Sequence, residues 1–305
     1  MNISDPIISK QNDSHHRRPS ARLATWLART RPALRPVEPV TNQQKITVVC
    51  VSDTHNARPP LPDGDLLLHA GDLSQYGTFA EVQAQLNWLD EQPHRHKVVI
   101  AGNHDLILDT AFVKSHPDRE LDRPGKSAGD LNWGSICYLQ DSSVTLSTNE
   151  RPVTIFGSPW TPRCGNFAFQ YHRNEDVWAG KIPLATDILL THGPPATLLD
   201  NGKGCNHLLA ELWRSRVPLV VFGHIHEAHG HGYLELNSVQ ALQQEIVLGQ
   251  RGWLAVLQLL SLIAWEWLQS LSRKPRETVT IEVVNAALDQ RRVDVSRFQA
   301  ITVEL

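Results

Sequence analysis

Short apolar runs recur along the chain from Lys45 onward, and each is bounded by Gly, Asp, Asn or His. Their length and their content of Val, Ile, Leu and Phe are typical of buried β-strands. Segments of helical length and periodicity lie between several of these runs. In residues 78–91, a capping Thr precedes apolar side chains at helical spacing, namely Phe79, Val82, Leu86 and Leu89. Strands that alternate with helices predict an α/β domain built in layers.

Five of the apolar runs end in a short polar motif, and every motif contains side chains that bind metals. The motifs are Asp53-Thr54-His55, Gly71-Asp72, Gly102-Asn103-His104-Asp105, Thr191-His192-Gly193 and Gly223-His224-Ile225-His226. Loops that leave the carboxyl ends of strands in an open α/β sheet converge on one crevice, so we expect these side chains to meet. Carboxylate and amide oxygens together with imidazole nitrogens bind first-row divalent ions. The pattern favours a two-metal hydrolytic site, in which a bridging carboxylate holds both ions.

Each motif by itself has an ordinary structural explanation. Asp53-x-His55 is too short to distinguish a ligand pair from a strand end, and Gly102-Asn103-His104-Asp105 is rich in residues that favour tight turns. Gly223-His224-Ile225-His226 is equally compatible with two surface histidines. The metal hypothesis depends on all five occurring in one order, because the ordinary explanations predict no agreement among them.

In order and spacing, the five motifs resemble the signature of the calcineurin-like metallophosphoesterases over roughly residues 45–290. Three further stretches, 157–162, 191–195 and 284–286, resemble the brain-type metallophosphoesterase-domain phosphodiesterases and their fungal and bacterial relatives. The resemblance implies an α/β fold of four layers, an αββα sandwich of two packed sheets flanked by helices. It places a dimetal site at one edge of that sandwich.

The resemblance also implies a role for each matched residue. The first metal would be bound by Asp53, His55 and His226, and the second by Asn103, His192 and His224. Asp72 would bridge the two ions, His104 would be the catalytic imidazole, and Asp105 would orient it. The ions would be two divalent metals, and the ligand types do not choose among Mn, Fe, Zn and Ni. Tyr76 and Asp105 stand where the protein Ser/Thr phosphatases have Arg and Glu, which disfavours a phosphoprotein phosphatase.

These residues predict a metal-dependent phosphoester hydrolase, acting as a phosphodiesterase on a small soluble substrate through a metal-bridging hydroxide that attacks phosphorus. A phosphomonoesterase or nuclease of the same superfamily is the enzymatic alternative. A non-catalytic, metal-loaded scaffold that recruits a membrane or a partner is an alternative of another class.

The formal net charge of -3 does not attract a polyanion, so no nucleic-acid partner is expected. Four widely spaced cysteines favour a reduced, cytoplasmic protein.

Two segments depart from the α/β pattern of the domain, which we place at residues 45–305. Residues 1–44 are rich in Pro, Ser, Asn and Arg, and we expect a disordered N-terminal tail there. A mitochondrial transit peptide is the alternative, opposed by Asp5 and Asp13. Residues 238–276 predict a continuous helical insertion before the last strands. Its uncharged run at 253–265 is shorter than the roughly 20 residues that span a bilayer.

The sequence leaves three roles open for residues 238–276. The segment can be a helix packed on the domain, a peripheral helix at a membrane interface, or a surface for a protein partner. The family resemblance implies none of the three. The sequence does not determine an oligomeric state.

Overall fold

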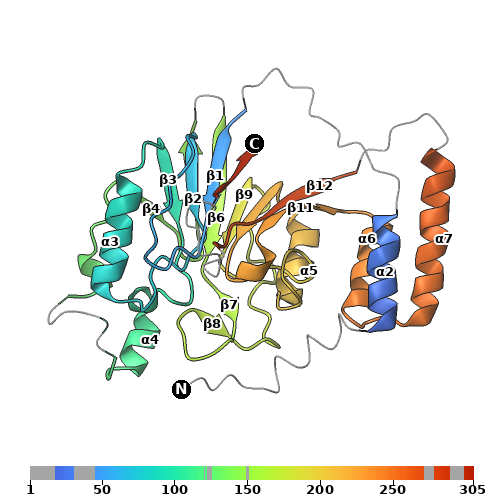
Figure 1. The fold of residues 1–305 in the computed structure, drawn as a ribbon, viewed down its shortest axis with the longest axis horizontal. Helices are drawn as coiled ribbons and strands as arrows, with labels where there is room; N and C mark the ends of the chain where they lie inside the picture. The colour runs from blue at the N-terminus through green and yellow to red at the C-terminus, as the bar shows by residue number, and fades with distance from the viewer. Residues whose placement is uncertain are drawn as a thin grey trace.

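Two β-sheets pack face to face at the centre of the molecule (Figure 1). The computed structural model describes residues 18–30, 45–119, 121, 126–148, 151–270, 278–288 and 299–305. The first sheet has the order β13-β1-β2-β3-β4. Its strands are β13 (Ile301–Glu304), β1 (Thr47–Val51), β2 (Leu66–His69), β3 (His96–Val99) and β4 (Cys137–Tyr138).

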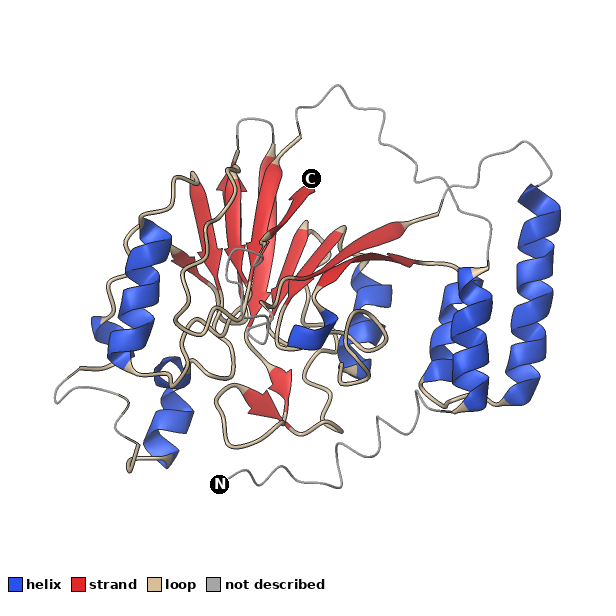
Figure 2. Ribbon diagram, in the orientation of Figure 1, coloured by secondary structure: helices blue, strands red, loops and turns tan. Residues whose placement is uncertain are grey.

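The second sheet has the order β11-β12-β10-β9-β6-β5. Its strands are β11 (Gly230–Glu235), β12 (Thr280–Asn285), β10 (Leu219–Phe222), β9 (Ile188–Thr191), β6 (Pro152–Ser158) and β5 (Ser142–Ser147). A small ribbon of β7 (Thr161–Pro162) and β8 (Gln170–Tyr171) lies outside both sheets (Figure 2). The central strands of each sheet are parallel to one another, so their carboxyl ends lie at a common edge.

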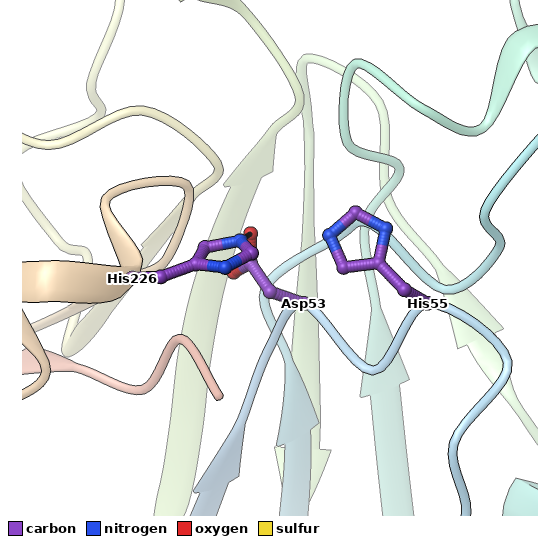
Figure 3. Close-up of side chains that lie close together, drawn as sticks. All are labelled: Asp53, His55 and His226. Carbon is purple, nitrogen blue, oxygen red and sulfur yellow. Dashed lines mark hydrogen bonds and ion pairs between the residues drawn. The ribbon is translucent and has the colours of Figure 1, made fainter. Parts of the chain in front are cut away.

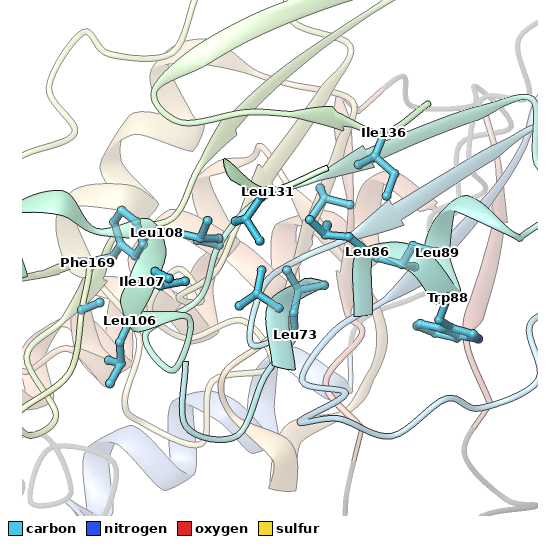
Figure 4. Packing of buried hydrophobic residues seen from close by; sticks show 14 of the residues in the cluster. Leu73, Leu86, Trp88, Leu89, Leu106, Ile107, Leu108, Leu131, Ile136 and Phe169 are labelled. Carbon is cyan, nitrogen blue, oxygen red and sulfur yellow. The ribbon is translucent and has the colours of Figure 1, made fainter. Parts of the chain in front are cut away.

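The alternation of side chains along each strand builds the layers. In β1, Val48 and Cys50 face the second sheet and share a core with Ile188 and Val221. Val49 and Val51 face the other way, toward helix α3 (Phe79–Asp90). Figure 4 shows this outer core, where the leucines of α3 meet residues from the loops beside it.

The second sheet is covered in the same manner. The outer faces of β9, β10 and β12 pack against α5 (Asn206–Ser215), with Leu208 and Leu212 in that core. The order of layers is therefore helix, sheet, sheet, helix, and the predicted αββα sandwich is confirmed. The predicted helix start is also observed, because Thr78 and Glu81 form a capping box at the beginning of α3. A short helix, α4 (Thr110–Ser115), and three single turns at 106–108, 128–130 and 226–228 complete this part of the described chain.

The expectation of disorder over residues 1–44 is wrong for residues 18–30, which contain helix α2 (Pro19–Arg29). Its buried side chains Ala21, Ala24 and Leu27 form a narrow stripe that packs against α6 and α7. Such a stripe is too short to stand out in a sequence, and it becomes stable only through contact with distant helices. The remainder of the predicted tail lies outside the described residues.

The continuous helix expected over residues 238–276 is two helices, α6 (Ser238–Val247) and α7 (Trp253–Ser270). Gly249 adopts a φ of +75°, a conformation that glycine reaches without strain and that ends α6. Residues 271–276 lie outside the described part of the chain. Helices α2, α6 and α7 stand side by side next to the sandwich (Figures 1 and 2) and share a small core of their own.

Candidate metal centre

The five polar motifs all lie at the common edge where the parallel strands end. Asp53 and His55 follow β1, Asp72 follows β2, and Asn103 follows β3. On the second sheet, His192 follows β9, while His224 and His226 follow β10. Backbone bonds join neighbouring motifs: the Asp53 N–H donates to Gly71 O at 2.9 Å, and the Gly223 N–H donates to His192 O at 3.0 Å. The convergence expected from strand topology is confirmed.

The backbone at this edge is strained in a way that turns side chains into the centre. Asp53, Asp72 and His224 have φ values of 57°, 54° and 69°, in the left-handed region that residues other than glycine rarely occupy. Each such residue costs on the order of 1–3 kcal/mol, and such residues cluster at functional sites.

Gly102 and Gly223 leave space for the carboxylates of the centre. A Cβ on Gly102 would overlap the Asp72 carboxylate, and one on Gly223 would overlap that of Asp53.

The first group of ligand atoms consists of Asp53, His55 and His226, all within 4.8 Å of one another (Figure 3). Asp53 is fully buried, and its Oδ1 lies 3.0 Å from His226 Nε2. The Ser52 hydroxyl donates to its other oxygen at 2.6 Å. His55 Nδ1 is buried without a hydrogen-bond partner among the described residues. An orphaned imidazole nitrogen beside a buried carboxylate is suited to binding a metal ion.

The second group consists of Asp72, His192 and His224, again within 4.8 Å. His192 Nδ1 donates to Ala70 O at 2.9 Å, so Nε2 is the ring nitrogen that faces the centre and is left for a metal ion. Nε2 lies 3.0 Å from Asn103 Oδ1, so the amide joins this group. A third group of ligand atoms, from His55, Asp72 and His104, also lies within 4.8 Å of one another.

Asp72 lies between the two groups and presents one oxygen to each. Its Oδ2 is 3.7 Å from His55 Nε2 in the first group, and its Oδ1 is 3.4 Å from His192 Nε2 in the second. The residue is buried, so no bulk water solvates these oxygens. This is the position that a bridging carboxylate occupies between two ions.

The buried carboxylates of the centre carry negative charge that cations would balance. Burial acts to raise the pKa of Asp53, but the hydrogen bond with His226 and the charge of His192 outweigh it and lower the pKa to about 2. Burial opposes ionisation of Asp72 as well, yet the charge of His192 and its hydrogen bond keep the pKa well below the usual value. Two ionised, buried carboxylates need compensating positive charge, and divalent ions would supply it.

The imidazoles respond in opposite directions. Burial acts to lower the pKa of His192, but the charge and hydrogen bond of Asp72 raise it to about 9. Burial and the charge of His192 lower the pKa of His224 to about 3. Burial also lowers the pKa of His55. The neutral forms of His55 and His224 are the forms that coordinate metals.

His104 lies at the rim of the centre, next to both groups. Its Nδ1 donates to Gln75 O at 2.8 Å, so Nε2 is the nitrogen left for a substrate. Its backbone N–H donates to Asp72 Oδ1 at 2.8 Å. The ring lies against Phe167, with centroids 4.6 Å apart. The half-buried imidazole is thereby held in one orientation beside the ligands.

Asp105 does not orient His104, contrary to the role that the family resemblance implies. Its carboxylate accepts hydrogen bonds from the backbone N–H groups of Leu73 (3.2 Å), Ser74 (2.9 Å) and Gly102 (2.8 Å) and from the Ser74 hydroxyl (2.7 Å). The reason is geometric: the Asp105 carboxylate bonds to the backbone of the two loops, while the His104 ring bonds to Gln75 O. Asp105 therefore holds the loop after β2 to the loop after β3.

Several residues at the site carry no signal in the sequence. Ser52 and Ser74 support Asp53 and Asp105, but serines beside a motif are common. Phe167 is far from any motif in the sequence and contacts His104 only in the folded structure.

A cavity of about 560 Å³ includes Phe167 in its wall, together with Phe112, Trp160, Arg163, Gln170, Tyr171 and Lys181. This cavity is on the side of the centre where the His104 ring lies.

The fold and the ligand groups are those of the metallophosphoesterase class of proteins. The family model described as calcineurin-like phosphoesterase matches residues 45–228, which is more than half of the chain. The chain belongs to this family. In relatives of this family two metal ions are usual, and the ligand groups described above fit such a pair.

Several relatives are similar to the chain over different lengths. The chain is 40% identical over 273 residues to a protein of Emericella nidulans named probable rhamnogalacturonate lyase C, covering 87% of this chain and 25% of that protein. It is 39% identical to human metallophosphoesterase domain-containing protein 1 over 60% of this chain and 61% of that protein. A UPF0046 protein of Caenorhabditis elegans is 34% identical over 64% of this chain and 57% of its own length. The chain thus spans a quarter of the first relative and about three fifths of the other two.

Proposed function

We propose that the protein is a dinuclear metal-dependent phosphodiesterase that acts on a small organic phosphoester. The observation that carries the proposal is the placement of Asp72 between two ligand groups, with one oxygen 3.7 Å from His55 and the other 3.4 Å from His192. A carboxylate that serves two sets of ligands is what a pair of ions requires. The complete set of seven predicted ligands at one edge supports a working centre. The residues that surround it are Asp53, His55, Asp72, Asn103, His192, His224 and His226.

The metal pair, when bound, would neutralise a phosphate and make a water molecule acidic enough to act as a nucleophile near neutral pH. Asp53, His55 and His226 would hold one ion, and Asn103, His192 and His224 would hold the other. The protein's own contribution to bond cleavage is assigned to His104. Its Nδ1–H is committed to Gln75 O, so a proton on Nε2 is the one available for the leaving oxygen.

A diester suits the charges of the centre better than a monoester. In the described part of the chain, the ion pairs of Asp53 and Asp72 are all with histidines, and no Lys or Arg joins them. A monoester carries more negative charge than a diester and would gain more from such a cation. The neighbouring cavity has Trp160, Phe167 and Tyr171 in its wall and offers room for an organic group on the ester. Its wall also contains Arg163 and Lys181, and Lys181 is paired with Asp141 at 2.7 Å.

The test compares two chromogenic esters after reconstitution with Mn²⁺, Zn²⁺, Ni²⁺ or Fe²⁺. We expect faster turnover of bis-p-nitrophenyl phosphate than of p-nitrophenyl phosphate. Asp72→Asn should lower turnover by about a thousandfold, because the bridging charge contributes several kcal/mol. Asp63→Asn makes the same chemical change at an exposed carboxylate and should leave turnover unchanged.

The remaining outcomes separate the alternatives. Preference for the monoester would make the protein a phosphomonoesterase, and cleavage of single-stranded DNA or RNA would make it a nuclease. Binding of metals without turnover of any phosphoester would contradict the proposal and favour a scaffold. The lyase activity in the name of the fungal relative belongs to that protein, of which this chain matches 25%.

A further inference from the structure

Helix α7 is apolar on both of its faces. Toward the neighbouring helices it buries Ala255, Val256, Leu259 and Ile263. On the other side it exposes Leu254, Leu257 and Leu268, which retain 84%, 62% and 65% of their accessible surface. With 3.6 residues per turn, these three leucines fall on one face. The polar Ser261 lies on this face between Leu257 and Leu268, and its hydroxyl donates within the helix to Gln258 O at 2.7 Å. A surface helix ordinarily presents polar side chains there, and a contiguous apolar patch marks an interaction site.

The exposed face of α7 carries no charge. The helix has one charged residue, Glu266, which is half-buried and lies opposite Leu257 by helical spacing. Exposed tryptophans stand at both ends of the face, Trp253 at the start and Trp265 close to the end. Tryptophan favours the boundary between lipid headgroups and acyl chains, because its ring is apolar and its N–H is polar.

Helix α2, which packs against α7, adds a basic stripe. Arg18, Arg22, Trp26 and Arg29 are exposed and share one side of the helix by their spacing. Among the described residues, none of these arginines forms an ion pair with a carboxylate. Helix α2 itself contains no acidic residue.

The basic character continues in the sequence after α7, where Arg273, Lys274 and Arg276 follow within seven residues of its end. The described helices α2, α6 and α7 with their flanks hold four arginines, including Arg251, against two glutamates. This local excess contrasts with a formal charge of -3 for the whole chain. A patch of this sign is complementary to anionic lipid headgroups.

We propose that the three-helix unit of α2, α6 and α7 docks the protein on the surface of an anionic lipid bilayer, with α7 lying in the plane of the interface. Leu254, Leu257 and Leu268 enter the acyl boundary, and the arginines of α2 contact lipid phosphates or carboxylates. Figure 1 shows α7 as the outermost helix, with α2 and α6 between it and the sandwich. In the described ranges, no helix is long and apolar enough to cross a membrane.

A second copy of the chain is a poorer occupant for this face. Pairing of two α7 faces would bury the exposed leucines but would provide no opposite charge for the arginines of α2. A lipid surface uses both the apolar face and the charge. The inference does not depend on the proposed phosphodiesterase activity.

The test is flotation of the full chain with vesicles of phosphatidylcholine alone or mixed with phosphatidylserine. The wild-type protein should float with the mixed vesicles and far less with phosphatidylcholine alone. The double variant Leu257→Glu/Leu268→Glu should reduce partitioning at least tenfold. Leu184→Glu is the matched control, because Leu184 is 72% exposed on the sandwich, and it should bind as the wild type does.

The charge contribution is tested separately. Arg22→Gln and Arg29→Gln should each weaken binding to the mixed vesicles by about fivefold, and added salt should weaken it further. Circular dichroism and turnover of a soluble phosphoester check that each variant is folded. These residues lie outside the metal centre, so turnover should not change.

Two results would overturn the inference. One is a wild-type protein that does not float with phosphatidylserine vesicles, or a double variant that floats equally well. The other is a dimer in analytical ultracentrifugation that the double variant dissociates, without vesicle binding by the wild type, which would assign the face to a second copy.

Discussion

Replacement of Asp105 with alanine tests whether a single buried carboxylate holds the loops of the metal centre together. In the wild type, Asp105 accepts hydrogen bonds from three backbone N–H groups, those of Leu73, Ser74 and Gly102, and from the Ser74 hydroxyl. The hydroxyl can rotate to another acceptor, but the three N–H groups cannot. Each buried donor left unpaired costs about 1–3 kcal/mol. The expected loss is therefore about 3–9 kcal/mol, comparable to the whole stability of a typical domain.

Asparagine at this position gives a graded comparison. The amide keeps one acceptor oxygen, which can serve Leu73 and Gly102, while its NH₂ faces Ser74. One N–H is then unpaired and two charge-assisted bonds become neutral ones, so the expected cost is about 2–4 kcal/mol. Burial and the charge of Asp72 raise the pKa of Asp105 to about 6, although the hydrogen bonds from Gly102 and Ser74 act to lower it.

Urea denaturation of the metal-free protein measures these losses as changes in the free energy of unfolding. Asp63→Ala is the control, because Asp63 is an exposed carboxylate outside this loop connection, and its effect on stability should be small. The two effects should add in the double variant. An Asp105→Ala protein that unfolds at the wild-type urea concentration would refute the assigned role, as would an equal loss of stability in Asp63→Ala.

Three further predictions concern the centre itself. His104→Gln should lower kcat by about 10²–10⁴-fold while leaving metal content by mass spectrometry unchanged; loss of metal instead would make His104 a ligand. Gly223→Ala should weaken metal binding in titration calorimetry, because the new methyl group displaces the Asp53 carboxylate; unchanged affinity would contradict the steric argument. The stability that the His192 proton contributes to the metal-free protein is fully present below pH 6.5 and should fall as pH rises through about 9, since Asp72 raises that pKa. Urea midpoints at several pH values test this, and bound metal should abolish the trend by replacing the proton.

The candidate ligands of the centre could be named from the sequence because their chemistry follows local signals. A strand is recognisable from a few consecutive apolar residues, and a parallel sheet brings the ends of its strands to one edge. Asp53, Asp72 and His192 therefore required no knowledge of tertiary contacts. The capping box at Thr78 is local in the same sense, because both of its partners lie within one helical turn.

The partners of polar side chains could not be predicted in this way. Asp105 follows His104 directly, yet its carboxylate bonds to a loop some thirty residues earlier in the chain, and the His104 ring bonds to Gln75. Which partner a carboxylate takes depends on how two loops are placed in space. Neighbouring positions in a sequence carry little information about that placement.

The sequence by itself determined the layered α/β fold and the set of candidate metal-ligating side chains, since strand periodicity and strand-end motifs are encoded over a few residues. Only the tertiary structure decided that α2 exists, that α6 and α7 are separate helices, and that Leu254 and Leu257 face outward. The physical reason is that a helix with apolar side chains on several sides has no preferred face until its neighbours cover one of them. Burial is a property of the whole fold, whereas periodicity is a property of the segment.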